Sequence, residues 1–91
     1  MSAARANPLA AGSVFVGVGT YAGATMRETG TAAAVVRLWD NASAASGTLI
    51  AVFGCGLSGA VVHNTPITVA FMKGIFVEVV SGVVEGAIYL N

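Results

Sequence analysis

The chain has 91 residues, of which 56% are hydrophobic and 9% are charged, and its four basic and four acidic residues cancel. This length supports one domain, and the charged fraction lies well below the ~25% of a typical soluble domain. We expect no nucleic-acid partner, because affinity for phosphates depends on clustered Lys and Arg side chains. A single cysteine, Cys55, excludes an intrachain disulfide scaffold.

In chain order, residues 1–12 contain Pro8 and Gly12 and are expected to form an irregular N-terminal arm, whereas residues 13–91 form the domain. From residue 13 onward, apolar side chains recur at every second position, the period of a β-strand. The predicted strands are residues 13–21, 25–29, 32–40, 48–53, 60–64, 67–72, 75–81 and 83–91. Turn residues separate them, so the pattern predicts an all-β fold, a small antiparallel β-sandwich of seven or eight short strands that is Ig-like or jelly-roll-like.

The same alternation divides each strand between a core face and an outward face. The residues predicted to point into the core are Val14, Val16, Val18, Val36, Leu38, Leu49, Ala51, Phe53, Ile67, Val69, Phe71, Ile75, Val77, Val79, Val84, Ile88 and Leu90. The outward faces combine charges with large apolar groups at Arg37 and Trp39, at Phe76 and Glu78, and at Tyr89. Aromatic and Arg residues are enriched where proteins bind one another, so these five residues are the predicted interface with a partner. The alternative, that Trp39 and Phe76 are buried, stays open.

The segment GCGLSG, residues 54–59, has the G-x-G-x-x-G spacing of dinucleotide-binding loops. In those loops the last glycine opens a helix, whose N-terminus holds the phosphates. Here Gly59 is followed by strand-forming residues and Pro66, which do not form a helix. We therefore expect a hairpin or an inter-sheet connection at this segment.

The residues that carry catalytic or metal chemistry do not cluster in the sequence. His63 is the only histidine and is predicted to lie in a loop beside a proline turn. Glu78 and Glu85 lie in consecutive predicted strands and are expected to be near neighbours on one solvated face. Cys55 has no His or Cys partner nearby. We therefore expect no enzyme activity, no catalytic residue, no cofactor and no bound metal.

A membrane span is the other reading of the apolar composition. Residues 48–72 carry no charge and are long enough to cross a bilayer. They also contain glycines and the polar residues His63, Asn64 and Thr65, which are costly inside a membrane. Because the flanking segments alternate like strands, we expect no membrane span, and the N-terminal region lacks the continuous apolar stretch of a signal peptide.

Two segments resemble small proteins encoded in the structural gene regions of tailed bacteriophages: VVRLWDNASAASGTLIA, residues 35–51, and KGIFVEVVSGVVEGAIYLN, residues 73–91. In that family a strand ending in an aromatic-Asp pair is followed by a small-residue loop and Gly-Thr. A glycine-led strand, a Ser-Gly turn and a last strand come near the C-terminus. The matching residues are Trp39, Asp40, Gly47, Thr48, Gly74, Ser81, Gly82 and the closing strand to Leu90.

The resemblance implies a non-enzymatic structural protein of the virion, located on the capsid surface. It implies a capsid decoration (cement) or minor capsid protein that binds the major capsid protein and stabilises the particle, or a protein in a tail or connector position. The neutral, apolar composition independently favours a homo-oligomer that works inside an assembly. The alternative from another class is a small carbohydrate- or surface-binding module, in which Tyr21, Trp39 and Tyr89 stack on sugar rings.

Overall fold

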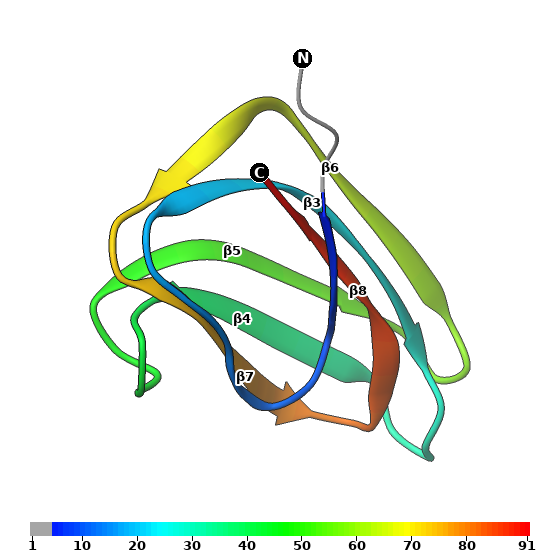
Figure 1. Ribbon diagram of the computed structural model, residues 1–91. Helices are drawn as coiled ribbons and strands as arrows, with labels where there is room; N and C mark the ends of the chain where they lie inside the picture. The colour runs from blue at the N-terminus through cyan, green and yellow to red at the C-terminus, as the bar shows by residue number, and fades with distance from the viewer. Residues whose placement is uncertain (1–4) are drawn as a thin grey trace.

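Eight β-strands make up the computed structural model, which describes residues 5–91, without the side chains of residues 64–67. The strands are β1 (Arg5–Pro8), β2 (Gly12–Val16), β3 (Gly19–Glu28), β4 (Ala34–Asp40), β5 (Thr48–Cys55), β6 (Ala60–Phe71), β7 (Gly74–Ser81) and β8 (Val84–Leu90). They form two four-stranded antiparallel sheets, in the orders β1-β8-β3-β6 and β2-β7-β4-β5, which enclose one core (Figure 1). The predicted small antiparallel β-sandwich is therefore confirmed.

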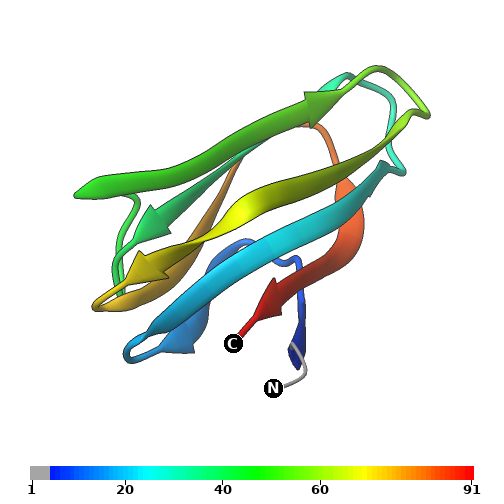
Figure 2. The ribbon, with the colours of Figure 1, turned by 90° about the horizontal axis from the view of Figure 1, so that it is seen from above.

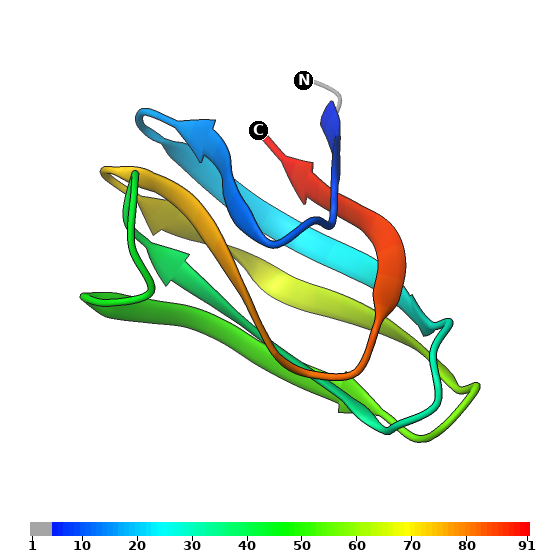
Figure 3. The same cartoon turned by 90° about the horizontal axis from the view of Figure 1, so that it is seen from below.

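The order of the strands identifies the sandwich as a jelly roll. Among the described strands, each connection passes from one sheet to the other, except the β4–β5 hairpin within one sheet (Figures 2 and 3). The chain therefore winds as the two Greek keys that define a jelly roll. Of the two sandwich types that the sequence left open, the structure selects this one.

The core lies between the sheets and takes side chains from both of them. The predicted core residues that are buried are Val36, Leu38, Ala51, Phe53, Phe71, Ile75, Val77, Ile88 and Leu90. Val14, Val69, Val79 and Val84 are partly buried against this cluster. Burial of each large apolar side chain contributes about 1.5–3 kcal/mol before the entropy cost of ordering it.

Val16 and Val18 are each 69% exposed, contrary to the prediction that both point into the core. For Val16 the cause is a register shift between Ser13 and Phe15 in β2, because a β-bulge reverses the alternation of faces beyond it. Phe15 packs against the core instead, with its ring edge-on to a buried phenylalanine of β6 at a centroid distance of 5.7 Å. Val18 lies in the turn between β2 and β3, next to Gly17, whose positive φ of 126° follows the end of β2.

Leu49 was also predicted to lie in the core and is instead 43% exposed. The register of β4 with β5 shifts here, since Leu38 pairs with Ala51 and the next residue, Trp39, pairs with Leu49. This second bulge turns Leu49 to the solvent side of the sheet. The side chain of Ile67, another predicted core residue, lies outside the described residues.

Two strands are longer than the alternation predicts. β3 includes the end of the predicted strand 13–21 and most of the predicted strand 25–29, and β6 joins the predicted strands 60–64 and 67–72. β3 and β6 pair with each other antiparallel, with a register shift between Tyr21 and Gly23. The ladder between β3 and β6 is interrupted between Asn64 and Val69, but the backbone of β6 stays extended across the interruption. Hydropathy alternation therefore underestimates the length of the strand.

Part of the predicted irregular arm, residues 1–12, is a strand. β1 pairs antiparallel with β8, from Arg5 opposite Leu90 to Pro8 opposite Ala87. This corrects the prediction for residues 5–8, and the sandwich begins before residue 13. β1 is an edge strand, where a proline is tolerated and pairing on one side needs no apolar alternation, so the sequence carries no strong signal for it.

A buried carboxylate ties three connections together at one end of the sandwich. Glu28, the last residue of β3, is 3% exposed. Its Oε1 accepts a hydrogen bond from the backbone N–H of Ser58 at 3.2 Å, and its Oε2 accepts from those of Gly30 and, at 3.5 Å, Val83. Burial opposes ionisation, but these three backbone donors outweigh it and lower the pKa of Glu28. The charged carboxylate therefore joins the connections that follow β3, β5 and β7.

A second carboxylate holds the β6–β7 turn at the end of β4. Both oxygens of Asp40 accept from the backbone N–H of Met72, at 3.1 and 3.0 Å, and Oδ1 also accepts from that of Lys73 at 2.8 Å. Burial opposes ionisation here too, yet these backbone donors and the charge of Lys73 lower the pKa of Asp40. The following Asn41 accepts from the backbone N–H of Ser43 at 2.9 Å, as small polar residues do in the turns between strands.

Candidate binding surface

Four of the five predicted interface residues lie together on what we call the outer face, the solvent-facing side of the sheet β2-β7-β4-β5. The register of β4 with β7 places Arg37 opposite Glu78 and Trp39 opposite Phe76. The residues between them along each strand are buried in the core, so alternation directs these four side chains outward. β4 and β7 are the two central strands of the sheet, so the predicted pairs lie at the middle of the face.

Trp39 and Phe76 are half-buried in the isolated chain. Neither residue belongs to the buried core cluster, so the alternative in which both are core residues is wrong. Each residue is therefore partly covered and partly open to contact. This partial cover is suited to recognition, because a partner completes the burial of a large ring that is already ordered.

Glu78 connects the two pairs electrostatically. Its Oε1 accepts a hydrogen bond from Nε1–H of Trp39 at 3.1 Å and lies 3.7 Å from Nη1 of Arg37. The side chains of Arg37 and Glu78 are 45% and 34% exposed, so this ion pair contributes only about 0–1 kcal/mol to folding. The hydrogen bond to Glu78 holds the indole of Trp39 in one orientation. This reduces the conformational entropy that is lost when a partner contacts Trp39.

Apolar side chains surround this centre. Val52 is 49% exposed and pairs with Arg37 across β4 and β5, and Leu49, at 43%, pairs with Trp39. Val80 is 47% exposed and follows on the same side of β7. The outer face thus combines aromatic and aliphatic groups with one Arg and one neutralising carboxylate, which is the composition of the centre of protein interfaces. The sequence prediction missed Leu49 and Val52 as part of this surface.

Tyr89, the fifth predicted interface residue, lies in the other sheet. It belongs to β8 and pairs with Ala6 and Gly23 in the sheet β1-β8-β3-β6. Both chain neighbours of Tyr89 are buried, so its side chain lies on the opposite side of the sandwich from Trp39. The face that it shares also carries the ion pair of Arg27 and Glu85, at 3.0 Å. One flat partner therefore cannot contact Tyr89 and the outer face together.

Tyr21 is unavailable for stacking on a sugar, because it is fully buried. Its hydroxyl and Nδ1 of His63 share a hydrogen bond of 2.6 Å, and burial raises the pKa of Tyr21 above its ordinary value. His63 was predicted to lie in a loop, but it belongs to β6, and its ring is stacked with those of Tyr21 and Phe53 at centroid distances of 5.7 and 5.4 Å. This stack joins the two sheets, so His63 has a structural role.

The predicted proximity of Glu78 and Glu85 is wrong. β7 and β8 follow one another in the chain but belong to different sheets, because the connection between them crosses the sandwich. Their partners also differ, since Glu78 contacts Arg37 and Glu85 contacts Arg27. Among the described residues there is no group of three or more His, Cys, Asp or Glu side chains that could hold a metal ion.

The GCGLSG segment is an inter-sheet connection, as predicted. Gly54 and Cys55 end β5, a turn closes with a hydrogen bond from the N–H of Gly59 to the carbonyl of Gly56 at 2.9 Å, and β6 begins at Ala60. A strand follows the last glycine instead of a helix, so the helix N-terminus that binds phosphates in dinucleotide sites does not form. Within residues 5–91 no helix is long and apolar enough to cross a membrane.

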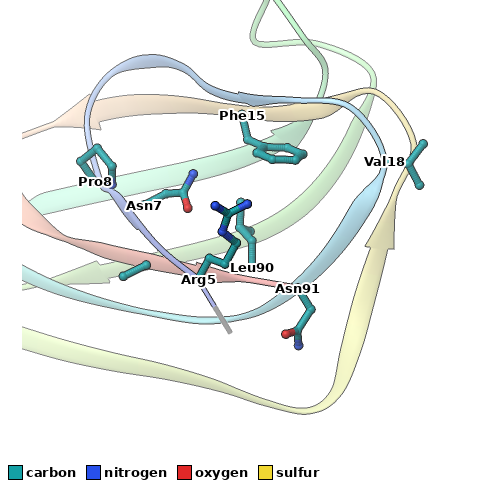
Figure 4. A pocket seen from close by; sticks show the side chains of 8 residues that line it. Arg5, Asn7, Pro8, Phe15, Val18, Leu90 and Asn91 are labelled. Carbon is teal, nitrogen blue, oxygen red and sulfur yellow. The ribbon is translucent and has the colours of Figure 1, made fainter. Parts of the chain in front are cut away.

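A cavity of about 420 Å³ opens where the edge strands β1 and β2 of the two sheets come together. Its apolar walls include Phe15, Val18 and Leu90, and Arg5 and Asn7 extend toward it from β1 (Figure 4). The volume falls within the range of small-molecule sites. Its lining contains one charged side chain and no His, Cys, Asp or Glu, so it offers no pair of groups for acid–base or nucleophilic chemistry.

Comparisons of the chain with protein-family models, with curated proteins and with solved structures find no match. Its class is therefore defined by architecture: a small jelly-roll β-sandwich whose two sheets present different outer faces. One face centres on Trp39 and Phe76, and the other carries Tyr89 and an exposed ion pair.

Proposed function

We propose that the protein is a non-enzymatic structural protein of a virion, a capsid decoration or minor capsid protein that binds the major capsid protein and stabilises the particle. The observation that carries the proposal is the aromatic pair Trp39 and Phe76 at the centre of an apolar outer face, with the indole held by Glu78. Jelly rolls occur among viral capsid proteins, and also among lectins and cupins. The fold therefore agrees with the resemblance to phage structural proteins without deciding between these classes.

The outer face loses exposed apolar surface when a partner covers it. Trp39 and Phe76 are half-buried, and the flanking Val52, Val80 and Leu49 are between 43% and 49% exposed. Completing their burial removes apolar area from water at roughly 25 cal/mol per Å². With no net charge on the chain, a partner surface of either sign approaches without long-range repulsion. A protein of this kind stabilises a particle by binding only to its assembled form.

The test is co-sedimentation of the purified protein with undecorated capsids. Trp39→Ala is expected to weaken binding by about 30-fold or more, the effect of losing a hot spot of about 2 kcal/mol. Tyr89→Ala is the matched control, since it removes an aromatic ring from the opposite side of the sandwich and is expected to leave binding unchanged. Equal losses for both variants would contradict the assignment of the outer face. Failure of the unmodified protein to sediment at low and moderate salt would contradict the proposal itself.

A carbohydrate-binding module remains the second candidate function, and only one of the three residues proposed to stack on sugar rings is placed for that role. Tyr21 is buried and Tyr89 lies on the other side of the sandwich, so of the three residues first considered only Trp39 is on the outer face. Trp39 is the only tryptophan, and its fluorescence therefore reports on this face alone. A change on glycan titration together with no change on mixing with capsids would favour the second candidate over the first. A reconstruction of the particle would distinguish a capsid from a tail or connector position.

A further inference from the structure

Each sheet of the sandwich has two edge strands, and three of these four edges carry features that hinder pairing with another strand. β1 has four residues, including Arg5 and Pro8. β2 has five residues and a bulge between Ser13 and Phe15. β6 contains Pro66, which has no N–H to donate. Short edges, prolines, charges and bulges are the means by which β-proteins avoid edge-to-edge association.

The fourth edge, β5, has much less protection. It is eight residues long, with the sequence TLIAVFGC, and contains neither a charge nor a proline. Its own bulge lies near the start, and from Ala51 to Cys55 it pairs with β4 residue by residue without interruption. This regular stretch leaves a row of N–H and C=O groups directed away from β4. In Figure 2, β5 (green) runs along the margin of the molecule.

We propose that β5 pairs antiparallel with β5 of a second copy of this chain, which joins two sandwiches into a dimer with one continuous eight-stranded sheet. An antiparallel strand pairs with itself about a two-fold axis, so the same surface serves both copies. Because β5 is uncharged and the chain has no net charge, two copies approach without like-charge repulsion. The nearest charges on the outer face, Arg37 and Glu78, neutralise one another within each copy.

The dimer also extends the outer face. Val52 lies on β5, beside Arg37 on β4, so in the paired arrangement the two copies of Val52 come near the two-fold axis. The apolar surface around Trp39 in one copy then continues into that of the other. A second copy therefore covers both the open edge of β5 and the exposed Val52. The dimer does not depend on whether the outer face binds a capsid.

The experiment measures self-association by sedimentation velocity over a concentration series, without any capsid. The unmodified chain is expected to sediment as a dimer that dissociates on dilution. Val52→Lys is expected to raise the dimer dissociation constant by at least about tenfold, because it brings two like charges together at the pairing edge. Val80→Lys is the matched control: Val80 has nearly the same exposure, 47% against 49%, and the same outer face, but it lies on the interior strand β7. It is expected to leave the dimer intact.

Hydrogen exchange of the unmodified chain gives an independent readout that needs no variant. Amides within Thr48–Cys55 are expected to exchange more slowly as the protein concentration rises, while those of the edge strand β2 do not change. A chain that stays monomeric at all concentrations, a dimer that Val52→Lys and Val80→Lys affect equally, or unchanged exchange in β5 would each overturn the proposal. Trp39→Ala is expected to stay dimeric while losing capsid binding, so failure of one proposal is distinguishable from failure of the other.

Discussion

Replacing Tyr21 by phenylalanine tests whether the hydrogen bond between β3 and β6 stabilises the fold. The substitution removes one hydroxyl group and keeps the ring, which is fully buried, so it leaves only a small void. The hydroxyl and Nδ1 of His63 share a bond of 2.6 Å. Such a bond contributes about 1 kcal/mol, and more where the remaining polar atom stays without a partner. Since His63 is half-buried, we expect the free energy of unfolding to fall by about 1–2 kcal/mol.

Thermal unfolding followed by circular dichroism measures this loss. In a domain of this size, 1 kcal/mol corresponds to about 4–8 °C in Tm, so Tyr21→Phe is expected to lower Tm by about 4–16 °C. Tyr89→Phe is the control, because Tyr89 is half-buried on the solvent side of β8. Away from buried polar contacts such a substitution changes stability by about 0.5 kcal/mol or less.

A double-mutant cycle isolates the pair. His63→Phe keeps an aromatic ring beside Phe53, where the centroids are 5.4 Å apart, but leaves the buried Tyr21 hydroxyl without its partner, at a cost of about 1–3 kcal/mol. The double variant removes both polar groups, so we expect it to be less destabilised than the sum of the two single variants by at least about 0.5 kcal/mol. Strict additivity, or a Tyr21→Phe variant as stable as the original protein, would refute this account of the stack.

Two further stability predictions follow from the turns and from one close backbone approach. The pKa values of Glu28 and Asp40 lie below their ordinary values of 4.5 and 3.8. The two carboxylates therefore contribute fully to the stability of the fold above the ordinary values, and this stability is lost as the pH falls through the lower pKa values of the folded state. Tm measured between about pH 7 and pH 3 is expected to fall at the acidic end, with a shallower fall for Glu28→Gln; a flat profile would be inconsistent with the charged turns. Gly86→Ala is expected to cost about 1–3 kcal/mol in urea unfolding, because a Cβ there would lie 2.0 Å from the carbonyl oxygen of Thr25. Gly56→Ala, with open space around the new methyl group, should unfold at nearly the original urea concentration, and equal effects of the two would contradict the steric argument.

Much of the core was predictable because side-chain alternation is a local property of an extended chain. Val36 and Leu38 in β4, and Ile75 and Val77 in β7, follow the predicted period and are fully buried. Val16 and Leu49 do not, since each lies next to a register shift. A bulge depends on which residues of a neighbouring strand form the ladder, and no pattern within one strand contains that information.

The amino-acid sequence by itself determined that this chain is an all-β sandwich, and it predicted that Arg37 and Glu78 point away from the core. For Trp39 and Phe76 it left burial open as an alternative, which the structure excludes. Only the tertiary structure decided which strands share a sheet. The connection between β7 and β8 crosses the sandwich, so Tyr89 faces away from Trp39 although its own strand alternates as expected. The physical reason is that the outward direction of a side chain follows from neighbouring residues, whereas the assembly of a surface follows from backbone pairing between distant segments.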